Sequence, residues 1–272
     1  MIKKVWLTVF LSAFAAVWIG ASAAFAAPFE FSPTAKNAFD KMTASTDEST
    51  AKKLNKAYTE LKSLQKQELD LDAATNSLRY ANEEAELAIR KRIKEIGQRE
   101  IKAAEAALNA AKKQHQPLFD LYEAQKKQLS AAKKLKNKSL TEYWNWQLDL
   151  TKIAVQLAKD DIRRKETALK NVKAKAAADM KKIRDILAAN DATKVKLKSA
   201  RSAVSTTRKR FTAESKVLLQ AVRKGEPFAA LSSFNGMLVY QKQILKDKSS
   251  MLALEQKIKS VIGQAESAIH RL

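Results

Sequence analysis

The sequence predicts an all-α protein, an elongated antiparallel bundle of long helices that forms a coiled-coil-like rod. Turn-forming residues are scarce, because 272 residues include only 5 glycines and 4 prolines, and average usage would supply roughly four times as many glycines. Alanine, lysine, leucine, glutamate and glutamine dominate instead, and these residues lose little on entering a helix. Apolar residues also recur every three or four positions, as they do on helices that pack against helices.

Residues 1–26 have the three parts of a secretory signal peptide. Lys3 and Lys4 precede an uncharged apolar run, which ends in the small-residue motif Ala24-Phe25-Ala26. We therefore expect cleavage near Ala26 and a protein that is periplasmic or secreted. The alternative is an uncleaved membrane anchor, because a membrane-spanning helix needs only about 20 apolar residues. The chain has no cysteine, so neither a disulfide nor a thiolate metal site is available.

Turn signals divide the mature chain into a leader, residues 27–49, and an elongated bundle over residues 50–272. The leader includes a short helix over residues 34–42, and Thr46 or Asp47 is expected to cap the next helix. The breaks are expected at His115-Gln116-Pro117, at Asn190-Asp191-Ala192-Thr193 and at Gly225-Glu226-Pro227. The resulting long helices are 48–114, 117–189, 192–224 and 227–271.

Two further signals fall inside these helices. Gly97 has no proline beside it, so we expect it to allow close packing or a bend and not to end a helix. Ser139-Leu140-Thr141-Glu142 matches a capping box and restarts the helix after a local break at residues 136–138. A continuous two-chain coiled coil is the alternative architecture, although many positions of the apolar stripe are alanine or polar and the stripe drifts from a strict heptad.

Positive charge is concentrated in the C-terminal part of the chain. The formal net charge is +22, and residues 117–272 hold 33 Lys and Arg against 15 Asp and Glu. Residues 170–224 alone hold 16 basic and four acidic side chains. Such an excess costs self-repulsion that an anionic partner would relieve. The candidate polyanion-binding residues are Arg163, Arg164, Lys181, Lys182, Arg184, Lys194, Lys196, Lys198, Arg208, Lys209 and Arg210.

The residue inventory argues against an enzyme. Only His115 and His270 are present, and glycine-rich phosphate loops are missing. Glu266 and His270 share a helix face, but a pair without further ligands does not make a metal site. We therefore predict no catalytic residue, no metal and no cofactor.

Two apolar stretches have alternative interpretations. Residues 140–158 contain Tyr143, Trp144 and Trp146, and we expect them to form the widest part of the bundle core. Residues 227–240 carry no charge and are either a buried helix start or a tip that inserts into a membrane or contacts a partner. The candidate tip residues are Phe228, Leu231, Phe234, Met237 and Leu238.

Together these patterns predict an exported, non-enzymatic helical rod that acts as a binding, spacer or adaptor protein of the cell envelope or extracellular space. Its expected partners are an anionic polymer or membrane surface, and another protein or a second copy through the long helices. No small-molecule substrate is inferred. The alternative is a membrane-active helical protein, such as a pore-forming toxin component, with its apolar tip at residues 227–240.

Overall fold

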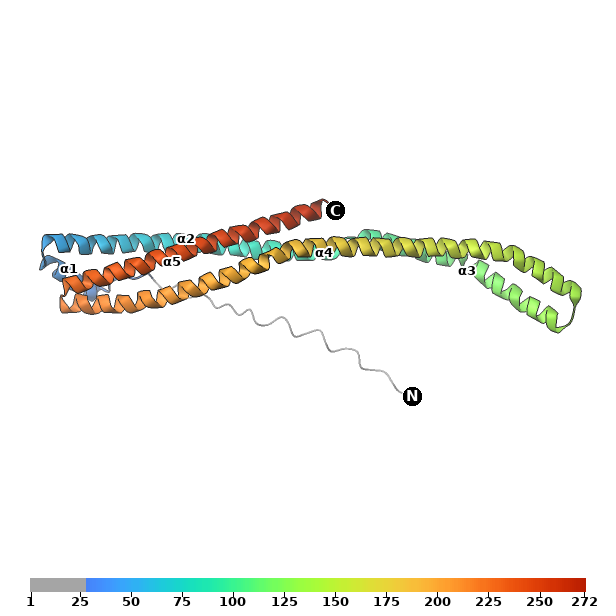
Figure 1. The fold of residues 1–272 in the computed structure, drawn as a ribbon, viewed down its shortest axis with the longest axis horizontal. Helices are drawn as coiled ribbons and strands as arrows, with labels where there is room; N and C mark the ends of the chain where they lie inside the picture. The colour runs from blue at the N-terminus through green and yellow to red at the C-terminus, as the bar shows by residue number, and fades with distance from the viewer. Residues whose placement is uncertain (1–27) are drawn as a thin grey trace, which may run out of the picture. The chain divides into compact units, whose positions relative to one another are not determined.

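The computed structural model describes residues 28–272, and these fold into five α-helices without a β-strand (Figure 1). This confirms the predicted all-α helical bundle. The predicted signal peptide, residues 1–26, lies outside the described residues. The helices are α1 (Pro33–Ala44), α2 (Glu48–Glu95), α3 (Gln98–Lys134), α4 (Lys138–Lys224) and α5 (Pro227–His270).

The first two helices begin at residues that satisfy their free backbone amides. The Ser32 side chain accepts a hydrogen bond from the Ala35 N–H at 3.3 Å, and Pro33 occupies the first turn of α1. Asp47 accepts from the Thr50 N–H at 2.9 Å at the start of α2. Hydrogen bonds from Thr50 hold the pKa of Asp47 below its usual value. The short leader helix and the cap at Asp47 are therefore as predicted.

Gly97 ends a helix, contrary to the prediction of one helix over residues 48–114. Its φ of +72° is left-handed, a conformation that glycine adopts without steric cost. The expected close packing is also present, because a Cβ added at Gly97 would lie 2.5 Å from the Ala176 Cβ. The helix is thus interrupted at a point where the backbone packs tightly against α4.

Pro117 does not end a helix, so the predicted break at residues 115–117 was wrong. It lies inside α3, and the turn occurs at residues 135–137, where Lys136 has a φ of +55° and Asn137 caps α4. Proline inside a helix costs about 3 kcal/mol. Packing against α4 holds α3 on both sides of the proline, because Leu108 and Ala111 are buried before it and Ala132 is buried after it. Beside the proline, Lys112 pairs with Glu166 at 2.8 Å, and the His115 Nε2 lies 3.2 Å from Asp161 Oδ2.

The predicted turn at residues 190–193 was also wrong, because α4 is continuous through it. Asn190 and Thr193 are buried, so these short polar side chains lie on the packing face of the helix. The predicted turn between α4 and α5 is confirmed. Gly225 there has a φ of +70°, and Pro227 begins α5.

The chain forms two compact units. Unit 1 comprises the described residues up to Gln67 together with Thr207–Gln243. Its core is partly aromatic: the ring of Phe234 lies 5.9 Å from Phe39, 6.1 Å from Tyr58 and 6.2 Å from Phe31, between centroids. Large side chains without solvent exposure complete this core, namely Leu54, Leu61, Leu218 and Met237.

Unit 2 comprises Glu68–Thr206 and Ile244–Leu272. Its apolar core is formed by α2, α4 and α5 through Ile89, Ile93, Ile183, Leu187, Leu197, Ile258, Ile262 and Ala265. A buried polar group lies on the same helices, where Lys248 Nζ is 2.5 Å from carboxylate oxygens of both Glu68 and Asp72. The rest of unit 2 is a helical hairpin in which α3 runs alongside α4 (Figure 1).

Only one face of residues 140–158 belongs to a core. Val155 and Ala158 are buried on the side of α4 that α3 covers, and Trp144 is half-buried. Tyr143, Trp146, Leu150 and Ile153 are exposed instead. The prediction that this stretch is the widest part of the core was therefore wrong for its outer face, because two helices cover only one side of each other.

Candidate anionic-partner surface

All eleven candidate polyanion-binding residues lie on α4, which presents them at the surface of the two units. Ten of these side chains are exposed, and Arg208 is half-buried. Arg163, Arg164, Lys181, Lys182, Arg184, Lys194, Lys196 and Lys198 belong to unit 2. Arg208, Lys209 and Arg210 belong to unit 1.

Three of the candidates in unit 2 form ion pairs within the protein. Arg163 Nη2 lies 2.5 Å from Asp160, and Arg164 Nη2 lies 4.0 Å from Asp161. Lys194 Nζ lies 2.8 Å from Glu86 on α2. Their charge is therefore partly neutralised, which makes them weaker candidates for an external anion.

The other candidates in unit 2 keep their charge available. Within the described residues, no carboxylate lies within ion-pair distance of Lys181, Lys182, Arg184, Lys196 or Lys198. All five side chains are exposed, whereas Ile183, Leu187, Asn190 and Leu197 on the same stretch of α4 are buried. We call Lys181, Lys182, Arg184, Lys196 and Lys198 the α4 basic surface.

Glu86 connects α2 to α4 through its ion pair with Lys194. Burial alone would raise the pKa of Glu86, but hydrogen bonds and charge from Lys194 and Arg90 outweigh it and hold the pKa below its usual value. Arg90 Nη2 lies 2.7 Å from Glu86. Sequence reasoning did not select Arg90 as a site residue, because its place beside Lys194 depends on a contact between residues more than 100 positions apart.

In unit 1, the three basic candidates differ in environment. Burial lowers the pKa of the Arg208 guanidinium, although an arginine stays protonated at neutral pH. Lys209 and Arg210 are exposed. The run of three basic residues therefore offers two side chains directly to solvent.

The five candidate tip residues do not share one exposed surface. Phe228 is 72% exposed and Leu231 is half-buried, but Phe234 and Met237 are fully buried and Leu238 is buried. Insertion of all five into a membrane would require the start of α5 to leave its packing in unit 1. The membrane-tip alternative remains a prediction.

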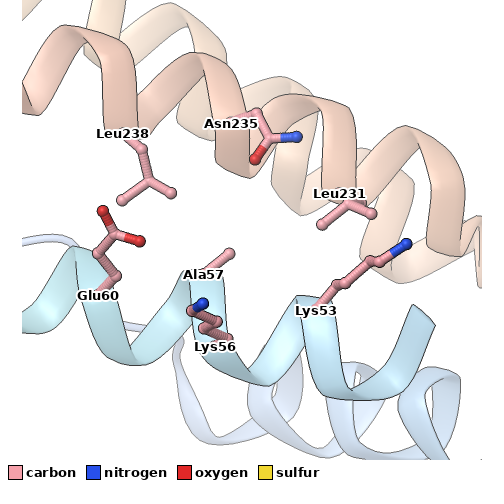
Figure 2. Close-up of a pocket in the computed structure, with 7 residues that line it drawn as sticks. All are labelled: Lys53, Lys56, Ala57, Glu60, Leu231, Asn235 and Leu238. Carbon is pink, nitrogen blue, oxygen red and sulfur yellow. The ribbon is translucent and has the colours of Figure 1, made fainter. Parts of the chain in front are cut away.

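A shallow hollow of about 200 Å³ lies between α2 and α5 in unit 1. Figure 2 shows Leu231 and Leu238 pointing from α5 toward α2, with Ala57 between them on the facing helix. Lys53, Lys56, Glu60 and Asn235 line the rest. Glu60 pairs with Lys242 at 2.7 Å, so the hollow contains paired surface charge and no nucleophile paired with a base.

Neither histidine belongs to a cluster of metal ligands. Among residues 28–272, no group of three His, Cys, Asp or Glu side chains could hold a metal ion. Glu266, the potential partner of His270, instead lies 3.4 Å from Arg92. In the same described range, every helix is too short or too polar to cross a membrane.

Comparison of the chain with known protein families, with curated proteins and with solved structures finds no match. The fold and the surface chemistry therefore define its class. The chain is an all-α helical bundle whose longest helix carries exposed basic side chains.

Proposed function

We propose that the protein is an exported helical protein without enzymatic activity, which acts as a binding, spacer or adaptor protein of the cell envelope or extracellular space. In this proposal, the α4 basic surface binds an anionic polymer or an anionic membrane surface. The observation that carries the proposal is that Lys181, Lys182, Arg184, Lys196 and Lys198 are exposed and have no carboxylate partner within the described residues.

The charge balance around this surface supports an anionic partner. Residues 170–224 hold 16 basic and four acidic side chains, so the surface repels itself unless anions approach it. A linear polyanion that binds there would release condensed counterions, which favours association at low salt. Solubility alone needs charge on a helix surface, but it does not need charge of a single sign.

The absence of enzymatic activity is proposed from the inventory of reactive groups. The chain has no cysteine and two histidines. One of these, His115, lies beside Asp161 in the α3–α4 hairpin, next to the ion pairs Lys112–Glu166 and Lys173–Glu105. Export, with cleavage near Ala26, is proposed because residues 1–26 have a basic start, an apolar run and a small-residue end.

The test is a binding titration of the mature chain, residues 27–272, with two anionic probes. The probes are a fluorescent single-stranded oligodeoxynucleotide and vesicles that contain phosphatidylglycerol, which separate a polymer from a membrane surface. The triple variant Lys181→Gln, Lys182→Gln, Arg184→Gln should bind the preferred probe at least about tenfold more weakly, because three counterion-releasing contacts are lost.

The matched control removes the same charge elsewhere. Lys41, Lys53 and Lys66 are exposed lysines of unit 1, and replacing all three with glutamine should change affinity less than about twofold. An equal loss in both triple variants would show that net charge alone attracts the probe. Absence of binding by the parent chain to either probe would overturn the proposal.

A further inference from the structure

We propose that an exposed apolar seam on α4 binds the same seam of a second copy of this chain, with the two helices antiparallel. The seam, which we call the outer seam, consists of Tyr143, Trp146, Leu150, Ile153 and Leu157. These five side chains are between 49% and 65% exposed. This self-association goes beyond the proposed binding of anions and uses a different part of α4.

The spacing of the outer seam is that of a coiled coil. Its residues follow one another at alternating steps of three and four, which keeps them on one stripe of the helix and matches the a and d positions of a heptad. The inner side of α4, with the buried Val155 and Ala158, already packs in the hairpin. One helix therefore carries two apolar seams, and residues 28–272 cover only one of them.

The surrounding charge favours a protein helix over an anionic membrane or polymer. Between the basic clusters that end at Lys138 and begin at Arg163, residues 139–162 hold four acidic and two basic side chains. Glu142, Asp149 and Asp160 all flank the outer seam on the same side. An anionic bilayer that covered the seam would meet these carboxylates, whereas a narrow stripe at heptad spacing fits an apolar seam on another helix.

A second copy offers both the apolar seam and the complementary charge. When two α4 helices are aligned antiparallel with Leu150 beside Ile153 of the second copy, Trp146 falls beside the second copy's Leu157. On the flank of the seam, Glu142 and the second copy's Arg163 occupy the same heptad position and lie about two residues, or about 3 Å, apart along the helix axis, within reach of a long arginine side chain. Symmetry repeats every contact. The same register also places Tyr143 beside the second copy's Asp160, a carboxylate that can accept from the phenol O–H.

The area is sufficient for a reversible dimer. If each of the five half-exposed side chains contributes about 100 Å², the pair buries on the order of 1,000 Å². That is near the lower limit for a specific interface, so we expect dissociation in the micromolar range.

The experiment is sedimentation velocity of the mature chain, residues 27–272, from about 1 to about 100 µM, where a micromolar dimer changes mass. The parent chain should move from monomer toward dimer across this range. Leu150→Glu places a carboxylate at the centre of the interface and should raise the dissociation constant at least about tenfold. Its control is Leu87→Glu, the same change at an exposed leucine of α2, which should leave the mass unaltered.

A charge exchange tests the antiparallel register. Glu142→Arg alone should weaken the dimer, and adding Arg163→Glu should restore it, because the two side chains lie within reach of each other across the interface. Circular dichroism of each variant should match the parent, since all the altered side chains are exposed.

Monomers at every concentration would overturn the proposal, as would equal effects of Leu150→Glu and Leu87→Glu. Failure of the double exchange to restore the dimer would overturn the register. Binding of a monomer to phosphatidylglycerol vesicles that Leu150→Glu abolishes would assign the seam to lipid instead. Leu150→Glu should bind the oligodeoxynucleotide with the affinity of the parent chain. The dimer proposal can therefore fail in sedimentation while the anion-binding proposal holds in the binding titration, and the reverse.

Discussion

Phe234→Ala should destabilise unit 1 strongly, because the side chain is fully buried among three aromatic rings. Phe234 has no solvent exposure and lies about 6 Å, between centroids, from Phe31, Phe39 and Tyr58. Truncating a buried phenylalanine typically costs about 3 to 5 kcal/mol. The loss of three aromatic contacts, each contributing about 0.5 to 1.5 kcal/mol, places the expected value in that range.

The assay must report on unit 1. In the fragment of residues 27–272, the tryptophans are Trp144 and Trp146, and both belong to unit 2. Tryptophan fluorescence of this fragment therefore follows the α3–α4 hairpin. Native-state hydrogen exchange of the α1 amides reports the free energy of opening unit 1 directly. Urea unfolding followed by far-UV circular dichroism gives the total loss of helix.

Phe228→Ala is the matched control, because Phe228 lies on the same helix and is 72% exposed. It should change the free energy of opening by less than about 0.5 kcal/mol. The core assignment of Phe234 would be refuted by a loss below about 1 kcal/mol, or by equal losses in the two variants. Phe234→Asp distinguishes the core assignment from the membrane-tip alternative. If residues 227–240 form a membrane tip, the variant should stay folded but no longer cause leakage from vesicles. If Phe234 is a core residue, the variant should unfold unit 1.

Two further predictions concern a turn and an ion pair of unit 2. Gly97→Ala should cost about 2 to 4 kcal/mol, because the added Cβ would meet Ala176 at 2.5 Å in a left-handed backbone. Gly225→Ala is the control: the backbone there is also left-handed, but nothing lies within 4 Å of an added Cβ. This substitution should therefore cost only about 1 to 2 kcal/mol. Equal losses of stability for the two variants in urea unfolding would contradict the packing argument. Glu86 has a lowered pKa in the folded protein, so its contribution to stability is present above its unfolded pKa and is lost as the pH falls through the folded value. Lys194→Met should raise the pKa of Glu86 and reduce the stability lost between pH 7 and pH 3, and parallel pH profiles for the two proteins would contradict this.

The sequence predicted the elements whose signals are local. Asp47 and the Gly225–Pro227 turn each act within one helical turn, and the structure uses them as predicted. The all-α class followed from composition and periodicity, which sum over many residues.

The errors lie where a tertiary contact overrides a local signal. Pro117 lies inside α3, which is buried in the hairpin at Leu108 and Ala111 before the proline and at Ala132 after it. Asn190 and Thr193 are typical of turns, yet they are buried inside α4. Gly97 ends α2 where close packing against Ala176 and a left-handed backbone coincide.

For the candidate surface, the sequence indicated the basic residues but not which of them form ion pairs within the protein. All eleven basic residues belong to one helix, but ion pairs with Asp160, Asp161 and Glu86 engage three of them. The pairing of Lys194 with Glu86 joins distant segments, so no local pattern could reveal it. The outer seam was hidden in the same way, because periodicity alone does not show which of two apolar faces is covered.

The salt dependence of binding tests the α4 basic surface most directly. The affinity of residues 27–272 for a single-stranded oligodeoxynucleotide should fall linearly on a logarithmic salt scale, with a slope of about −3 to −4 if five side chains contact phosphates. The triple variant at Lys181, Lys182 and Arg184 should flatten that slope by about 2. An affinity that does not depend on salt, or a slope that the triple variant leaves unchanged, would contradict the assignment of this surface to an anionic partner.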